Sequence, residues 1–157
     1  MLAIIWHSRT GASRAMAQAA CDGAGDRAML VAAPDVTPEL MLESAAYLFV
    51  CPENLGAMTG GMKEMFDKCY YPVLGNVEGR AYATAISAGS DGTGAQAQID
   101  RIVTGWRLKR VAEPVIVNLD AQTPEAILAK KKVPDNKLVT CHELGAALAE
   151  GLQLGVY

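Results

Sequence analysis

The sequence predicts a three-layer, doubly wound α/β protein with a five-stranded parallel sheet in the order 2-1-3-4-5. Short apolar segments alternate along the whole chain with longer segments of helical periodicity. The connections between them are short, and parallel strands need crossover helices. The 157 residues suffice for one such domain, and no linker, internal repeat or low-complexity segment divides the chain.

In the first half of the chain, predicted strands and helices alternate with short gaps. Residues 2–7 form a mostly apolar run between polar neighbours, as expected for a strand buried on both faces. Residues 12–24 place alanines and a methionine on one helical face. Residues 28–32 predict a second strand, and Thr37-Pro38-Glu39 combines a capping residue, a proline and an acid at a helix start. That helix is short, because the apolar residues 46–51 begin the third strand.

The second half continues the alternation. Methionine and aromatic residues at helical spacing within residues 62–70 predict the next helix. Residues 80–88 are predicted as the fourth strand, and residues 95–109 as a helix whose apolar residues share one side. Pro114 precedes a fifth strand at residues 115–117. Two further helices are predicted at residues 124–132 and 137–154.

The composition excludes several classes of protein. Hydrophobic residues make up 51% of the chain and charged residues 20%, which is typical of a folded globular protein. The net charge of −3 argues against a nucleic-acid-binding surface, and the one basic run, Lys130-Lys131-Lys132, is interpreted as a solvated helix end. No apolar run could span a bilayer, no signal-peptide pattern is visible, and the four cysteines form no Cys-x-x-Cys pair. We therefore expect a cytoplasmic protein without nucleic-acid, membrane or metal partners.

The segment Ser8-Arg9-Thr10-Gly11-Ala12-Ser13 lies where the first strand passes into the first helix. Three hydroxyl side chains alternate there around a single glycine. A helix start offers unpaired backbone N–H groups and the positive end of the helix dipole, so added hydroxyls favour a phosphate dianion. One of these residues could instead simply cap the helix. Because three hydroxyls are more than a cap needs, we predict phosphate binding.

Two further loops are predicted to converge on the same crevice. In a sheet of this order, ligands bind beyond the carboxyl ends of the strands, between strands 1 and 3. Residues 52–58 follow the third strand and residues 87–94 the fourth, and both segments contain glycine and small residues. Ordinary turns also use glycine. In two neighbouring loops, however, small residues let backbone amides approach a planar ligand closely.

With these three motifs in order, residues 1 to about 120 resemble the flavodoxin-like FMN proteins, and more closely their NAD(P)H-dependent FMN or quinone reductase branch. Residues 8–13 match the phosphate-loop pattern Ser/Thr-x-Thr-Gly-x-Ser/Thr. Residues 52–58, followed by Gly60, Lys63 and Asp67, are similar to the turn of the reductases and to the Gly-x-x-Lys-x-x-x-Asp helix after it. The glycine-containing loop after the fourth strand is the third motif.

The resemblance implies a role for each matching residue. The FMN phosphate would be held by Ser8, Arg9, Thr10, Gly11, Ala12 and Ser13. One edge of the flavin ring would lie along Pro52, Glu53, Asn54, Leu55, Gly56 and Ala57. The opposite edge and part of the ribityl chain would be covered by Ser87, Ala88, Gly89 and Gly92. The flavin would supply the redox chemistry while backbone amides stabilise charge on it, so no catalytic side chain is expected.

The composition of the two ring loops decides which activity the resemblance implies. Electron carriers of the family are usually strongly acidic and sandwich the flavin between aromatic rings. Here neither loop contains Trp, Tyr or Phe, and the net charge is only −3. An unstacked ring leaves one face open for a second flat molecule. We therefore expect an oxidoreductase that takes electrons from NADH or NADPH and passes them through FMN to a quinone, free flavin or similar small-molecule electron acceptor.

Other interpretations stay open at this point. An aromatic wall supplied by Tyr70, Tyr71 or Trp106, from the same chain or across an oligomer interface, would favour a flavodoxin-type carrier that delivers electrons to a protein partner. A chain that has lost the cofactor would be an interaction subunit. Reductases of this branch commonly assemble, so the resemblance also implies a homodimer or homotetramer. Cys21 and Arg27 have the Cys-x5-Arg spacing of a phosphatase loop, but they close a helix where such a loop should open one.

Overall fold

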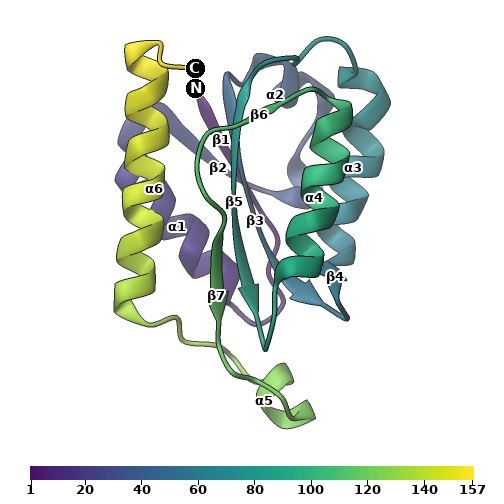
Figure 1. Ribbon diagram of the computed structural model, residues 1–157, viewed down its shortest axis with the longest axis vertical. Helices are drawn as coiled ribbons and strands as arrows, with labels where there is room; N and C mark the ends of the chain where they lie inside the picture. Colours follow the sequence, from purple (N-terminus) through teal and green to yellow (C-terminus); the bar gives the residue numbers. More distant parts are fainter.

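The computed structural model describes the whole chain, residues 1–157, as a three-layer α/β fold. A parallel sheet lies in the middle, with helices α1 and α6 on one face and α3 and α4 on the other (Figure 1). The strand order is β2-β1-β3-β5, and β6 and β7 both pair with the outer edge of β5. The predicted order 2-1-3-4-5 is confirmed, with β6 and β7 together in the place of the fifth strand.

The bounds of the elements follow the predicted alternation. The strands are β1 (Leu2–Trp6), β2 (Ala28–Ala32), β3 (Ala46–Asn54), β4 (Ala57–Met58), β5 (Ala81–Ala88), β6 (Lys109–Arg110) and β7 (Val115–Asn118). The α-helices are α1 (Ala12–Ala24), α2 (Pro38–Glu43), α3 (Gly60–Val73), α4 (Thr93–Gly105), α5 (Pro124–Leu128) and α6 (Asp135–Leu154). Two short 3₁₀ turns, Gly25–Arg27 and Ala33–Asp35, flank β2. No helix combines the length and hydrophobicity that crossing a bilayer requires.

Side chains of the central strands alternate between two apolar layers. In β3, Tyr47 and Phe49 point into the layer beneath α3 and α4, whereas Leu48 and Val50 point into the layer beneath α1 and α6. All of these side chains are fully buried. Burial on both faces explains why these strands are nearly continuous apolar runs in the sequence.

Helices α1 and α6 approach each other closely because both carry glycine where they meet. A Cβ atom at Gly145 would collide with the backbone of Ala20, and one at Gly23 would collide with the backbone of His142. Any larger residue at either position would push the two helices apart. This contact fixes α6, the last element of the chain, against the helix that begins at the predicted phosphate loop.

The edge of the sheet differs from the prediction. The predicted helix over residues 95–109 ends at Gly105, because the next residue, Trp106, is fully buried and its indole N–H donates to the Tyr70 carbonyl at 3.0 Å. The chain joins the sheet at Lys109, before the predicted fifth strand at residues 115–117, and Lys109 N donates to Arg80 O at 2.9 Å. β6 pairs with the start of β5 and β7 with its end, so the fifth strand is interrupted.

Two predicted segments also have different structures. Residues 52–58, expected to be a loop, form a hairpin in which β3 continues to Asn54 and pairs with the antiparallel strand β4. The predicted helix over residues 124–132 ends at Leu128, so Lys130-Lys131-Lys132 lies in an irregular connection to α6 and not at a helix end. Both corrections change the environment of the predicted site.

Candidate functional site

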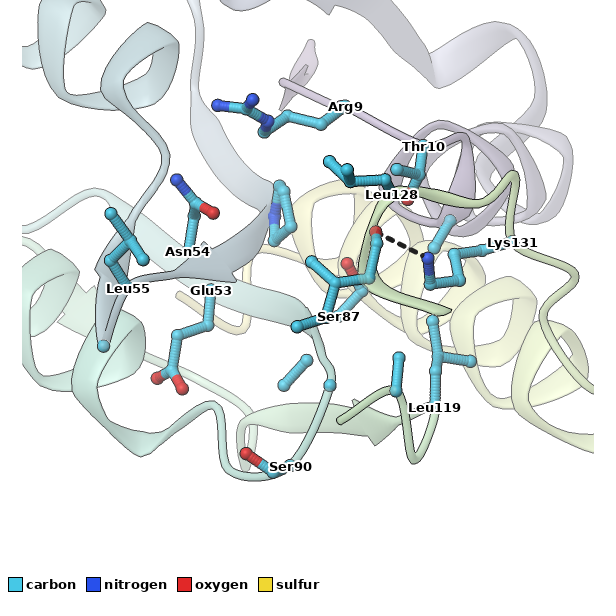
Figure 2. Close-up of a pocket in the computed structure, with 17 residues that line it drawn as sticks. Arg9, Thr10, Glu53, Asn54, Leu55, Ser87, Ser90, Leu119, Leu128 and Lys131 are labelled. Carbon is cyan, nitrogen blue, oxygen red and sulfur yellow. Dashed lines mark hydrogen bonds between the residues drawn. The ribbon is translucent and has the colours of Figure 1, made fainter. Parts of the chain in front are cut away.

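A cleft of about 360 Å³ opens at the carboxyl ends of β1, β3, β5 and β7, where the sequence predicts the ligand (Figure 2). The predicted residues that line it are Arg9, Thr10, Ala12, Pro52, Glu53, Asn54, Leu55, Gly56, Ser87, Ala88 and Gly89. Ser90, within the predicted loop at residues 87–94, lines it as well. The lining residues outside the three predicted loops are Leu119, Ala121, Ile127, Leu128 and Lys131. All three predicted loops therefore meet in one cavity. The volume lies within the range of about 300–1,000 Å³ that is typical of small-ligand pockets.

The loop between β1 and α1 leads into a helix start that has no side-chain cap. Gly11 adopts a φ of 99°, a left-handed conformation that glycine accommodates without strain, and α1 begins immediately after it with no side-chain cap. The N–H groups of the first turn are therefore free of the usual capping partner. Thr10 and Arg9 line the cleft beside them. A phosphate dianion would find backbone donors, a hydroxyl group and a cation at this place.

The two serines of this loop brace it and do not line the cleft. Ser8 Oγ accepts a hydrogen bond from Gly11 N at 3.0 Å. Ser13 is fully buried, and its hydroxyl lies 2.8 Å from that of Ser87 at the end of β5. Ser13 therefore joins the predicted phosphate loop to the neighbouring loop. Of the three predicted hydroxyl residues, Thr10 is the one that lines the cleft.

The hairpin after β3 is attached to α4 through Glu53. Its carboxylate accepts hydrogen bonds from Gly92 N at 2.9 Å and from Ala95 N at 3.1 Å, at the amino end of α4. Figure 2 shows this carboxylate turned away from Thr10 and Lys131. The side chain of Glu53 therefore caps a helix, a role in which a carboxylate also complements the helix dipole.

The tip of this hairpin presents an exposed apolar side chain at the edge of the cleft. Leu55 and Gly56 occupy the two turn positions with φ values of 53° and 73°. Leu55 is 97% exposed although it lines the cleft. A leucine with a left-handed backbone and no apolar partner is unfavourable on both counts. The adjacent Ala57, predicted as a flavin contact, lies in β4 and does not line the cavity.

The loop after β5 forms the opposite wall. Ser87, Ala88, Gly89 and Ser90 line the cleft. Gly92 does not, because it precedes α4 with a φ of 101° and packs against Ile116. Gly89 lies so close to the Ala121 carbonyl that a Cβ atom there would be only 2.5 Å from it.

The segment that follows β7 is the part of the site that the sequence analysis missed. Its backbone joins the predicted loops at three places: Leu119 N to Ala88 O at 2.8 Å, Ala121 N to Gly89 O at 2.9 Å, and Lys131 N to Thr10 O at 2.8 Å. The strand prediction could have indicated this segment, because the carboxyl ends of all parallel strands lie at one edge of the sheet. The loop after the fifth strand had to border the crevice.

Helix α5 within this segment carries two apolar residues to the cleft. Ile127 is 47% exposed and Leu128 is 72% exposed. Lys131 holds their position, since its ammonium group donates to the carbonyls of Ala126, Ile127 and Ala129 at 2.5, 2.9 and 2.6 Å. A lysine that binds the last carbonyls of a helix stabilises the end of that helix.

A histidine lies between the first two loops. His7 Nδ1 is 2.9 Å from Thr59 Oγ1, at the start of α3, and its ring packs against Gly61. Burial lowers the pKa of His7 below its usual value, and the positive charge of Arg9 lowers it further. The neutral imidazole is therefore the favoured form in the folded chain.

The aromatic residues lie elsewhere. Tyr70 follows the start of α3 by ten residues, a rise of about 15 Å along that helix. Trp106 is fully buried, and its ring stacks on that of Tyr70 with the centroids 5.7 Å apart. Tyr71 packs edge-on against Tyr70 at the same end of α3. The suggestion that these residues wall the cleft from within the same chain is therefore wrong, and the apolar lining is aliphatic.

The phosphatase-like spacing has no matching geometry. Cys21 lies in the last turns of α1, and burial raises the pKa of its thiol, which disfavours the thiolate. The guanidinium of Arg27 donates to Gln153 at 2.7 Å and to the Ala24 carbonyl. These two residues therefore do not form an anion-binding loop.

Comparison with solved structures places the fold among known proteins. A flavodoxin from the domain Archaea superposes with a TM-score of 0.77 at 21% identity, covering 98% of this chain and 99% of that one. The Flv1 flavodiiron core from Synechocystis sp. PCC6803 gives 0.75 at 17% identity, but this chain spans only 36% of its length. An NADPH-quinone reductase from P. pentosaceus gives 0.67 at 14% identity, covering 92% and 97% of the two chains. The sequence matches no protein-family model and no curated protein. The chain has the flavodoxin-like fold.

Proposed function

We propose that this protein is an FMN-dependent oxidoreductase that takes electrons from NADH or NADPH and delivers them to a quinone, free flavin or similar small molecule. The observation that carries the proposal is the meeting of an uncapped helix start, two small-residue loops and an aliphatic wall in one cleft. Each part fits a different portion of FMN.

The phosphate end fits the start of α1. Thr10, with its hydroxyl, and the free N–H groups of the first turn would hold the phosphate, and Arg9 would add a positive charge. The cross-loop contact between Ser13 and Ser87 keeps this cradle in register with the wall formed by residues 87–90. A cradle that is already formed requires less reorganisation when the ligand binds.

The ring end fits the hairpin and the loop after β5. Bound FMN would supply the redox chemistry, and the chain would supply position and electrostatics. Asn54 to Gly56 and Ser87 to Gly89 line the cleft, where their backbone groups could bind the edges of a flat heterocycle. Leu55 and Leu128 would exclude water from it.

Two observations favour a reductase over an electron carrier. The cleft is lined by Leu55, Leu119, Ile127 and Leu128 in place of aromatic rings, which leaves access for a second flat substrate. The net charge of −3 gives little long-range attraction toward a basic protein partner. That an NADPH-quinone reductase shares the fold is consistent with this choice.

The absorbance spectrum of the purified protein tests the proposal. We expect FMN to bind with a shifted flavin spectrum, and stopped-flow mixing with NADH or NADPH to bleach the flavin band. Addition of a naphthoquinone should then restore the band. FMN that binds but stays oxidised after mixing with both nicotinamide cofactors would overturn the reductase proposal.

The second candidate is a flavodoxin-type electron carrier, which the full-length match to an archaeal flavodoxin favours. It predicts a flavin that dithionite reduces but NAD(P)H does not. A carrier should also accumulate a one-electron semiquinone during a reductive titration. The same cuvette experiment therefore separates the two candidates.

A further inference from the structure

A second groove, of about 440 Å³, borders the cleft on the far side of Lys131, which lines both cavities. The groove lies between the first turns of α1 and the start of α6. It is lined by Ala15, Lys130, Lys131, Lys132, Val133, Asp135 and Leu138. The three lysines, expected to be a solvated helix end, instead lie in an irregular segment beside the predicted phosphate loop.

The three lysines of this segment differ in whether their side chains are hydrogen-bonded within the protein. Lys131 is engaged with the carbonyls at the end of α5. The residues on either side of it, Lys130 and Lys132, are exposed, and their side chains form no hydrogen bond or ion pair within the protein. By contrast, Lys63 is paired with Asp67 at 2.5 Å. Two free ammonium groups therefore lie at the rim of one groove.

The floor of the groove is apolar. Val133 is 3% exposed, and Ala15 and Leu138 are half-buried members of the layer between α1, α6 and the sheet. An aromatic base could lie against this floor while a phosphate meets the lysines. Asp135 is the one carboxylate in the lining, and it can accept a hydrogen bond from a ribose hydroxyl or an exocyclic amino group.

The groove and the cleft lie on either side of Lys131, the one residue that lines both. The chain passes from Ile127 and Leu128, exposed at the cleft, directly to Lys130 and Lys132 at the groove. An elongated ligand with one flat ring in the cleft and a phosphorylated arm in the groove would cover both. Of the two nicotinamide cofactors, only NADPH carries the additional phosphate, a monoester on the adenosine 2′-hydroxyl, and basic side chains are the usual partners of that group.

We propose that the groove formed by Lys130, Lys132 and the floor of Ala15, Val133 and Leu138 binds the 2′-phosphoadenosine half of NADPH, which makes NADPH the preferred electron donor. This inference rests on the proposed reductase function. It assigns the lysines a recognition role and gives them no part in electron transfer.

The direct test measures nucleotide binding without turnover. The chain is titrated with 2′,5′-ADP and with 5′-ADP, which has the same number of phosphates but none on the 2′-hydroxyl, by ligand-observed NMR or calorimetry. At low ionic strength we expect 2′,5′-ADP to bind at least about tenfold more tightly, with a smaller preference in high salt. Equal affinity for the two nucleotides would overturn the inference.

Matched variants locate the site. The double variant Lys130→Gln/Lys132→Gln should lose the preference for 2′,5′-ADP, while Lys137→Gln, an exposed lysine of α6 outside the groove, should retain it. Circular dichroism of each variant confirms that it is folded. A double variant that is folded and still prefers 2′,5′-ADP would refute the assignment of these lysines.

The kinetic arm separates this inference from the proposed function. In the wild type, kcat/KM should be higher for NADPH than for NADH. In the double variant, the KM for NADPH should rise until kcat/KM is similar for the two cofactors, while kcat and KM for NADH stay unchanged. If neither cofactor reduces the flavin, the proposed function fails, while the nucleotide titration still decides the binding site. If both reduce it equally well, the proposed function stands and this inference fails.

Discussion

Replacement of Leu55 by asparagine should stabilise the fold and weaken the binding of the flat ligand at the same time. Leu55 and Gly56 both have positive φ values, as the two-residue turn of a tight hairpin requires. Asn-Gly is the preferred pair for such a turn, whereas a leucine in this region costs about 1–2 kcal/mol. The 97% exposed side chain has almost no packing to lose.

The magnitude follows from these values. Asparagine should recover part of the backbone cost, so the free energy of unfolding should rise by about 0.5–1 kcal/mol. For a chain of 157 residues this raises Tm by about 1–4 °C. If bound ligand covers roughly half of the leucine, its loss should weaken binding by about 1 kcal/mol, or roughly fivefold in Kd.

The assay combines a thermal melt of the cofactor-free protein with a fluorescence titration of FMN. Leu55→Ala is the matched control. It removes the same contact but lacks the short polar side chain whose local hydrogen bonds let asparagine adopt the left-handed region. Leu154→Asn controls for an exposed leucine far from the cleft, 68% exposed at the end of α6. A lower Tm for Leu55→Asn would refute the strain argument, and FMN affinity unchanged in both Leu55 variants would refute the contact.

Three further predictions concern other parts of the structure. Thr10→Ala should weaken FMN binding about tenfold or more, since a hydrogen bond to a charged group contributes roughly 1.5–3 kcal/mol; an affinity within about twofold of wild type would remove Thr10 from the phosphate site. Gly145→Ala should lower the free energy of unfolding by about 1–3 kcal/mol, because its Cβ meets the backbone of Ala20, whereas Gly60→Ala, with open space around it, should be close to neutral in the same urea titration. The lowered pKa of His7 means that the unfolded chain takes up this proton at a higher pH than the folded one. Its contribution to stability is therefore present above about pH 6.5 and is lost as pH falls through the lowered pKa, and urea titrations from pH 5 to 7 should show a weaker pH dependence in His7→Asn.

The strand order and three of the cleft loops could be predicted because they depend on local patterns. The apolar runs of β1 and β3 and the hydroxyl-rich turn at residues 8–13 are visible within short windows of sequence. The hairpin after β3 was missed because Leu55 occupies a turn position where asparagine is the usual signal. The interruption of the last strand was missed because it depends on the burial of Trp106 against Tyr70, a contact between residues far apart in the chain.

The predicted site residues were largely found in one cleft, but several of their roles depend on partners that no local pattern specifies. Glu53 binds the amide of Gly92, and Ser13 meets Ser87. The amide of Lys131 binds the carbonyl of Thr10. Each of these bonds joins a different pair of loops, so the four segments around the cleft are held together before any ligand enters. Because these bonds restrain the loops relative to one another without a ligand, ligand binding retains more of its contact energy than it would at four independent loops. A substitution at Ser13 or Glu53 should therefore act on affinity through the alignment of the cleft. Its effect should be smaller than that of a substitution at Thr10, whose hydroxyl is proposed to bind the phosphate directly.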